Sequence, residues 1–251
     1  MSETFSLQGS SMLLHGPGKV GKTQLASSFP GVAFIASELG HKYLPEKIRK
    51  RVYKVTRDAE GWQRFLQLGS ALAPKVKTLV VDTIGNVYYA CMASVCKANG
   101  WTHPEDKRNR GWAAVRAEFI RGITALAEVC DKHNVTLILI AHSKVTHIDL
   151  SVQEYNKIEL DLPGQPSGVL VPAVDHIWYY GYANTDDMTS EDSQKMVDVL
   201  KAGEHTAERW LWVAGIESIQ AGTRDASITK TVVRNVPKTG QYSYIERELR
   251  K

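Results

Sequence analysis

One glycine-rich segment limits the possible folds of this chain more than any other part of the sequence. It fits the pattern GxxxxGKS/T, follows the apolar run Met12 to His15 directly, and opens the helical stretch Lys22 to Phe29. Such a loop surrounds phosphate with backbone N–H groups, so glycine is needed where a side chain would block the approach. The residues that we expect to bind nucleotide phosphates are Gly16, Pro17, Gly18, Lys19, Val20, Gly21, Lys22 and Thr23.

Two side chains of this loop and one later carboxylate have distinct expected roles. Lys22 should reach the β- and γ-phosphates, and the Thr23 hydroxyl should bind Mg²⁺. Asp82 closes the apolar strand Thr78 to Val81, where a carboxylate can hold magnesium through water. The expected cofactors are therefore ATP and Mg²⁺, with Thr23 and Asp82 at the metal and Lys22 and Asp82 among the catalytic residues. Thr83 either assists through its hydroxyl or caps the following helix.

The remaining pattern predicts an α/β fold with a mainly parallel central sheet flanked by helices. Uniformly apolar strands, Val32 to Ser37, Thr78 to Val81 and Val135 to Ala141, alternate with helical stretches, which is typical of strands buried on both faces. Beyond Ala141, apolar and polar residues alternate on both sides of Glu154-Tyr155-Asn156, which predicts an inserted β-hairpin.

The C-terminal part is expected to add antiparallel strands to this sheet. Val174 to Tyr182 and Arg209 to Val213 are the predicted strands, separated by an acidic surface segment, Thr185 to Asp192, and a short helix to Leu200. We interpret Tyr242 to Lys251 as a charged tail. The whole chain, residues 1–251, is expected to form a single domain whose core spans about residues 10–235.

Composition limits the class of protein without identifying it. The 251 residues are 43% hydrophobic and 23% charged, and no apolar run reaches the roughly 18 residues of a membrane helix. A net charge of +4 permits a polyanionic partner without requiring one. Cys91, Cys96 and Cys130 form no CxxC pair, so we expect buried thiols in a reducing, cytoplasmic setting rather than a metal site with His103.

Two further motifs indicate a particular class of phosphate-binding ATPase. Glu38 ends the strand Ala33-Phe34-Ile35-Ala36-Ser37, and His142 follows Ile140-Ala141 at the end of the fourth strand. With the glycine-rich loop, this order of motifs resembles the RecA class of recombinases. The resemblance implies that Glu38 activates the attacking water, whereas most AAA+ ATPases place the base beside the aspartate, where this chain has Thr83.

The same resemblance assigns a role to His142. RecA-like proteins often place a glutamine there that senses the γ-phosphate. Histidine can also donate one hydrogen bond to phosphate, although it titrates near neutrality.

The resemblance extends from Met12 to Ala221 in the order of elements, with no room for further domains, as in small phage-encoded ATPases of the Sak type that anneal single strands. It implies a homo-oligomer, a ring or a filament, with the nucleotide at the protomer interface, working in a bacterial host cytoplasm with a single-strand-binding protein as an accessory. RecA carries lysines near the segment Trp212 to Gly215 that reach the neighbour's nucleotide, but this segment has none. Arg224 is our substitute for a finger acting in trans.

Single-stranded DNA is the partner that the RecA class implies, held by loops after the third and fourth strands. The first loop combines cations with aromatic faces. The hairpin of the second is acidic, and the basic run Lys47 to Lys54 is an alternative surface. Our expected DNA-binding residues are Lys97, Trp101, Lys107, Arg108 and Arg110.

Three functions remain open on this reading. The first is a DNA-dependent ATPase for recombination or strand annealing. The second is a small-molecule kinase, which needs an arginine-rich lid that does not stand out in the sequence. The third is a nucleotide-gated DNA-binding scaffold with little hydrolysis.

Overall fold

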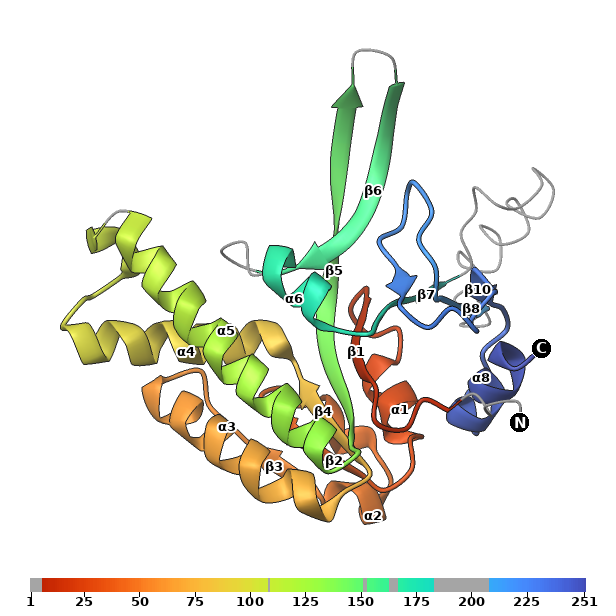
Figure 1. Ribbon diagram of the computed structural model, residues 1–251, viewed down its shortest axis with the longest axis horizontal. Helices are drawn as coiled ribbons and strands as arrows, with labels where there is room; N and C mark the ends of the chain where they lie inside the picture. Colours follow the sequence, from red (N-terminus) through yellow and green to blue (C-terminus); the bar gives the residue numbers. More distant parts are fainter. Residues whose placement is uncertain (1–5, 108, 151–152, 163–166, 183–207) are drawn as a thin grey trace.

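Strands from both halves of the chain pair into one ten-stranded sheet (Figure 1). The computed structural model describes residues 6–107, 109–150, 153–162, 167–182 and 208–251. The strands are β1 (Ser11–Gly16), β2 (Val32–Ala36), β3 (Val52–Lys54), β4 (Thr78–Asp82), β5 (Thr136–Leu150), β6 (Gln153–Asp161), β7 (His176–Tyr182), β8 (Arg209–Trp212), β9 (Gly222–Thr223) and β10 (Val232–Val233). Their order is β10-β8-β7-β1-β5-β4-β2-β3, with β6 paired to β5 and β9 to β7.

Helices cover both faces of this sheet. Because side chains alternate across a strand, Leu79 and Val81 face one apolar cluster and Val80 faces the other. The first cluster packs against α3, α4 and α5, and the second against α1 and α8 (Figure 1). The helices are α1 (Lys22–Ser27), α2 (Glu46–Arg49), α3 (Ala59–Leu72), α4 (Ile84–Asn99), α5 (Asn109–Lys132), α6 (Ser167–Ala173) and α8 (Gln241–Leu249), with 3₁₀ turns η1 (Gly40–Tyr43), η2 (Ala73–Lys75) and η3 (Pro104–Lys107).

The strand directions confirm the predicted fold class. Six adjacent strands run parallel to one another, in the order β7, β1, β5, β4, β2 and β3. At the other edge, β8 and β10 are antiparallel, as expected for the C-terminal part of the chain. The parallel strands β2 and β4 are buried on both faces, which accounts for their continuous apolar sequences.

The position of β5 determines where the functional side chains meet. It lies between β1 and β4, so that Gly16 pairs with His142 and Asp82 pairs with Ile140. The carboxyl ends of parallel strands lie at one edge of a sheet. The phosphate loop, Asp82 and His142 are therefore brought to the same edge although they lie far apart in the sequence.

The predicted hairpin is present, but its turn was misplaced in the sequence analysis. Strand β5 continues past the sheet through Leu150 and pairs with β6, and the two form a ribbon that projects from the body (Figure 1). Leu150 pairs with Gln153, and Glu154, Tyr155 and Asn156 lie inside β6 rather than at the turn. The alternating pattern is the same on either side of a turn, so it does not locate the turn.

The C-terminal segment is not a charged tail. Residues Gln241–Leu249 form α8, whose Ile245 and Leu249 are buried against the second cluster. The Tyr242 ring lies 4.7 Å from the ring of Phe29, the residue two positions after α1. The apolar positions recur at an interval of four residues, a helical period that the many charged residues between them obscured.

Other expectations can be compared directly with the structure. Cys91, Cys96 and Cys130 are all buried, as expected. Within the described residues, no helix has the length and apolar character needed to cross a membrane. The acidic segment from Thr185 to Asp192 and the short helix to Leu200 lie outside the described residues.

A buried histidine joins β1 to the base of the hairpin. His15 is fully buried, and its Nε2 donates a 2.6 Å hydrogen bond to the carbonyl oxygen of Gln220. Because a carbonyl can only accept, the neutral ring's Nδ1 accepts from the Ser143 hydroxyl at 2.9 Å. The pKa of His15 is lowered from 6.5 to about 4, mainly by burial and in smaller part by the charge of Lys22, against the raising effect of the Gln220 carbonyl.

We predict that His15 makes the fold sensitive to acid. The unfolded chain takes up a proton below about pH 6.5 while the folded chain resists until about pH 4, so stability present above pH 6.5 is lost as the pH falls. The loss is on the order of 3 kcal/mol. Urea unfolding at pH 7 and pH 4.5 should show a smaller loss for His15→Gln than for the parent, whereas His133→Gln, at an exposed histidine, should match the parent.

Candidate active site

The phosphate loop connects the end of β1 to the start of α1. Gly21 precedes α1 with a φ of 105°, in the region that favours glycine. At Gly16, a Cβ atom would overlap the carbonyl oxygen of Tyr180 on β7. The glycines of the motif are thus required by the backbone path and by close packing on the sheet, as well as by access of phosphate to the N–H groups.

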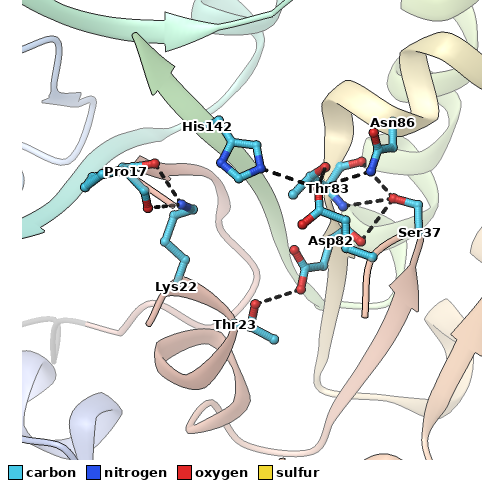
Figure 2. A network of polar contacts seen from close by, with 10 residues as sticks. Pro17, Lys22, Thr23, Ser37, Asp82, Thr83, Asn86 and His142 are labelled. Carbon is cyan, nitrogen blue, oxygen red and sulfur yellow. Dashed lines mark hydrogen bonds and ion pairs between the residues drawn. The ribbon is translucent and has the colours of Figure 1, made fainter. Parts of the chain in front are cut away.

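Lys22 points back into its own loop. Its Nζ donates hydrogen bonds of 2.7 Å to the carbonyl oxygens of Gly16 and Pro17, and the residue is only 6% exposed (Figure 2). Burial lowers the pKa of Lys22 to about 8, although the nearby carboxylates of Asp82 and Glu38 raise it. A phosphate group would restore full charge to this lysine, because an adjacent anion favours the protonated amine.

The expected metal ligands are already in contact. The Thr23 hydroxyl donates a 2.8 Å hydrogen bond to Oδ2 of Asp82 (Figure 2). Asp82 is buried, and burial raises the pKa of its carboxyl, an effect strengthened by the negative charge of Glu38 and opposed by the Thr23 bond and by Lys22. Hydroxyl and carboxylate oxygens are the ligands that Mg²⁺ prefers, so this pair fits the ion.

Glu38 lies beside Asp82 and receives three hydrogen bonds on one oxygen. Its Oε1 accepts from the Thr83 hydroxyl at 3.0 Å, from Asn86 Nδ2 at 3.1 Å and from His142 Nε2 at 3.4 Å. The bond from His142 is the main cause of a lowered pKa for Glu38, and burial opposes it. The carboxylate is therefore ionised at neutral pH, which is the form that a general base needs.

His142 lies between the phosphate loop and the start of α4. Its ring lies between Lys22 on one side and Thr83 with Asn86 on the other (Figure 2). The side chain is 43% exposed, so it can reach a ligand from β5. The direct contact between His142 and Glu38 was not expected from the sequence, because residues 104 positions apart meet only through the strand order.

These side chains line a cavity of about 850 Å³. Its lining also includes Tyr43, Pro45 and Ile48 and the segment 238–241. Gln24 of α1 anchors that segment through a 3.1 Å hydrogen bond to the carbonyl oxygen of Lys238. This segment was not predicted from the sequence, in which the only indication of it is the helical period that follows Gly240.

The cation–aromatic loop does not adjoin this cavity. Helix α4 begins at Ile84, and Lys97 lies 13 residues further along it, which corresponds to about 20 Å. Lys97 pairs with Glu60 of α3, and Trp101 packs against the core. This loop is therefore separated from the phosphate loop by the length of α4.

The other expected DNA-contact residues are only partly described. Arg110 is exposed at the start of α5, and the side chains of Lys107 and Arg108 lie outside the described part of the chain. In the alternative basic run, Lys47 lines the nucleotide cavity and Lys50 pairs with Glu46 at 2.9 Å. DNA binding by either surface stays a prediction.

Arg224 lies outside the cavity of its own chain. It is exposed at the end of β9, its guanidinium donates to the carbonyl oxygen of Pro172, and its backbone N–H donates to Asp175. It is not among the residues that line the cavity containing Lys22. Its expected role in trans stays a prediction.

The loop geometry, the Thr23–Asp82 pair and the placement of Glu38 together define a P-loop ATPase domain. The chain belongs to the AAA domain family, whose model matches residues 8–224. The residue beside Asp82 is nevertheless Thr83, and the carboxylate nearest the site comes from the end of β2. No curated protein matches the chain by sequence.

Solved structures with a similar fold include that of the RadB recombinase, with a TM-score of 0.48 and 15% sequence identity. The match covers 93% of this chain and 90% of that one. A KaiC-like protein from the hyperthermophilic archaeon Pyrococcus horikoshii gives a TM-score of 0.45 and 15% identity, covering 86% and 82% of the two chains.

We predict that Lys22→Met removes nucleotide binding and leaves the fold intact. The lysine bonds only to carbonyls of its own loop and sits at a cavity wall, so stability should change by less than about 1 kcal/mol. ATP at a hundred times its dissociation constant should stabilise the parent by about 3 kcal/mol and the variant not at all. Thermal unfolding with and without MgATP measures this. Lys132→Met, at an exposed cation at the end of α5, is the control, and equal stabilisation of parent and Lys22→Met would contradict the assignment.

Proposed function

We propose that this protein hydrolyses ATP with Glu38 as the general base, and that it acts on single-stranded DNA in recombination or strand annealing. One observation carries the catalytic part of the proposal. An ionised carboxylate, Glu38, is held by three donors in the same cavity as Lys22 and the Thr23–Asp82 pair. A binding scaffold does not need such a group beside the phosphates.

Each side chain has a defined part in this reaction. Bound magnesium, held by Thr23 and Asp82, would neutralise charge on the β- and γ-phosphate oxygens. Lys22 leaves the carbonyls of its loop and donates to the same phosphates. Glu38 orients the attacking water and accepts its proton, and His142 donates a hydrogen bond to the γ-phosphate from the opposite side.

The cavity supports a nucleoside triphosphate rather than a kinase substrate pair. Among the described residues that line it there is no arginine, whereas kinases close an arginine-rich lid over the transferred phosphate. The part of the cavity lining that includes Tyr43, Pro45 and Ile48 offers an aromatic and apolar surface suited to a nucleobase. We therefore place the triphosphate at Lys22 and the base at Tyr43.

The missing arginine also favours an oligomer. In related reactions an arginine often stabilises the charge of the transition state, and it can come from a neighbouring subunit. We propose a ring or filament of the Sak type in which the nucleotide lies between protomers and an exposed arginine, Arg224 by our choice, reaches the next cavity. Single-stranded DNA is proposed to bind the cation–aromatic loop between Lys97 and Arg110.

Glu38→Gln is expected to separate catalysis from binding. The amide keeps the shape of the side chain but cannot accept a proton, so the hydrolysis rate should fall by about a hundredfold to ten-thousandfold. ATP affinity and melting temperature should stay near those of the parent. Steady-state ATPase assays with and without single-stranded DNA, beside nucleotide titrations, test this. Glu46→Gln, at an exposed carboxylate on α2, is the matched control, and near-normal turnover by Glu38→Gln would place the base elsewhere.

Replacing Lys107, Arg108 and Arg110 together with alanine should weaken binding of single-stranded DNA. Each phosphate contact contributes about 0.7 to the slope of log affinity against log salt concentration, so the slope should become shallower by up to about 2. Fluorescence anisotropy of a labelled oligonucleotide at several salt concentrations measures this. A parallel variant of Lys47, Arg49 and Arg51 is the comparison. If only that variant flattens the slope, DNA binds the basic run instead.

A further inference from the structure

A buried asparagine behind the proposed base has no role in the reaction as described so far. Asn86 lies in the first turn of α4 and is only 6% exposed. Burying an amide is unfavourable unless it is hydrogen-bonded, and Asn86 directs its Nδ2 at Glu38 Oε1 across 3.1 Å. The side chain thus contacts the base and does not line the cavity itself.

The pattern of bonds on Glu38 is one-sided. Thr83, Asn86 and His142 all donate to Oε1, and no donor among the described residues bonds Oε2. Three donors on one oxygen restrict rotation of the carboxylate group. The second oxygen remains available for a water molecule.

Two of the three donors belong to a fixed element. Thr83 and Asn86 flank the start of α4, which follows Asp82 directly, and the backbone N–H of Thr83 also bonds the Ser37 hydroxyl at 3.1 Å. His142 instead extends from β5, is partly exposed and makes the longest of the three bonds. When His142 turns to a γ-phosphate, Thr83 and Asn86 still hold Oε1.

We propose that Asn86 is a positioning residue that holds Glu38 Oε1 so that Oε2 faces the attacking water. This inference rests on the proposed role of Glu38. The groups that act on Glu38 through their charge are Lys22, Asp82, Arg57 and His142, whereas Asn86 carries no charge. Its effect is therefore on the orientation of the carboxylate rather than on the charge balance of the site.

The test is a double-mutant cycle between Asn86 and Glu38. Asn86→Leu keeps the number and branching of the heavy atoms of the side chain and removes the donor. It should lower kcat about tenfold to a hundredfold, as a misplaced catalytic group does, with KM for ATP within about twofold of the parent. In the Glu38→Gln background, the same substitution should change the residual rate less than twofold, because no base remains to be positioned.

Two controls keep the outcome clear. Asn86→Ala serves as a second variant if leucine does not fit, and Asn99→Leu, at the opposite end of α4, should leave kcat unchanged. Equal fold-losses in both backgrounds, or a parallel fall in melting temperature, ATP affinity and kcat, would overturn the positioning role. Retained turnover by Glu38→Gln alone would instead overturn the proposed base, so the two failures are distinguishable.

Discussion

The whole site depends on the pairing of β5 with β1 on one side and β4 on the other. This pairing brings Gly16 beside His142 and Asp82 beside Ile140, so residues from three distant parts of the chain meet at one edge. If β5 paired at the outside of the sheet, β1 and β4 would be neighbours and His142 would lie away from both. The apolar sequence of β5, buried on both faces, is what makes the central position favourable.

The surroundings shift the pKa values of two neighbouring carboxylates in this site in opposite directions. Asp82 is more deeply buried, and burial raises the pKa of its carboxyl. Glu38 is stabilised as an anion by the donors on Oε1. At Glu38 the hydrogen bonds thus outweigh the effect of burial, whereas at Asp82 burial dominates. Burial likewise lowers the pKa of Lys22, although the charges of Asp82 and Glu38 raise it.

The sequence alone predicts those parts of the molecule whose signals are local. The phosphate loop, Asp82 and the parallel strands each depend on a short run of residues, and the structure places them as expected. Features that depend on contacts between distant segments were missed. The bonds of His142 and Asn86 to Glu38 exist only because of the strand order and the start of α4. The length of α4 likewise decides that Lys97 lies far from the cavity, and no local pattern reports that distance.

The hairpin and the phosphate site are parts of one continuous strand, and this limits how they can move. His142 and Ser143 are adjacent on β5, with their side chains on opposite faces; the first faces Glu38 and the second bonds His15 of β1. On β6, the backbone N–H of Leu160 donates to the side-chain Oε1 of Gln220. The backbone carbonyl of Gln220 in turn accepts from His15. The base of the hairpin is therefore tied to the strand that enters the phosphate loop. A shift of His142 along β5 must either carry the ribbon with it or break the buried His15–Ser143 bond. Breaking that bond is costly because His15 is fully buried, so moving the ribbon as a unit is the favoured response.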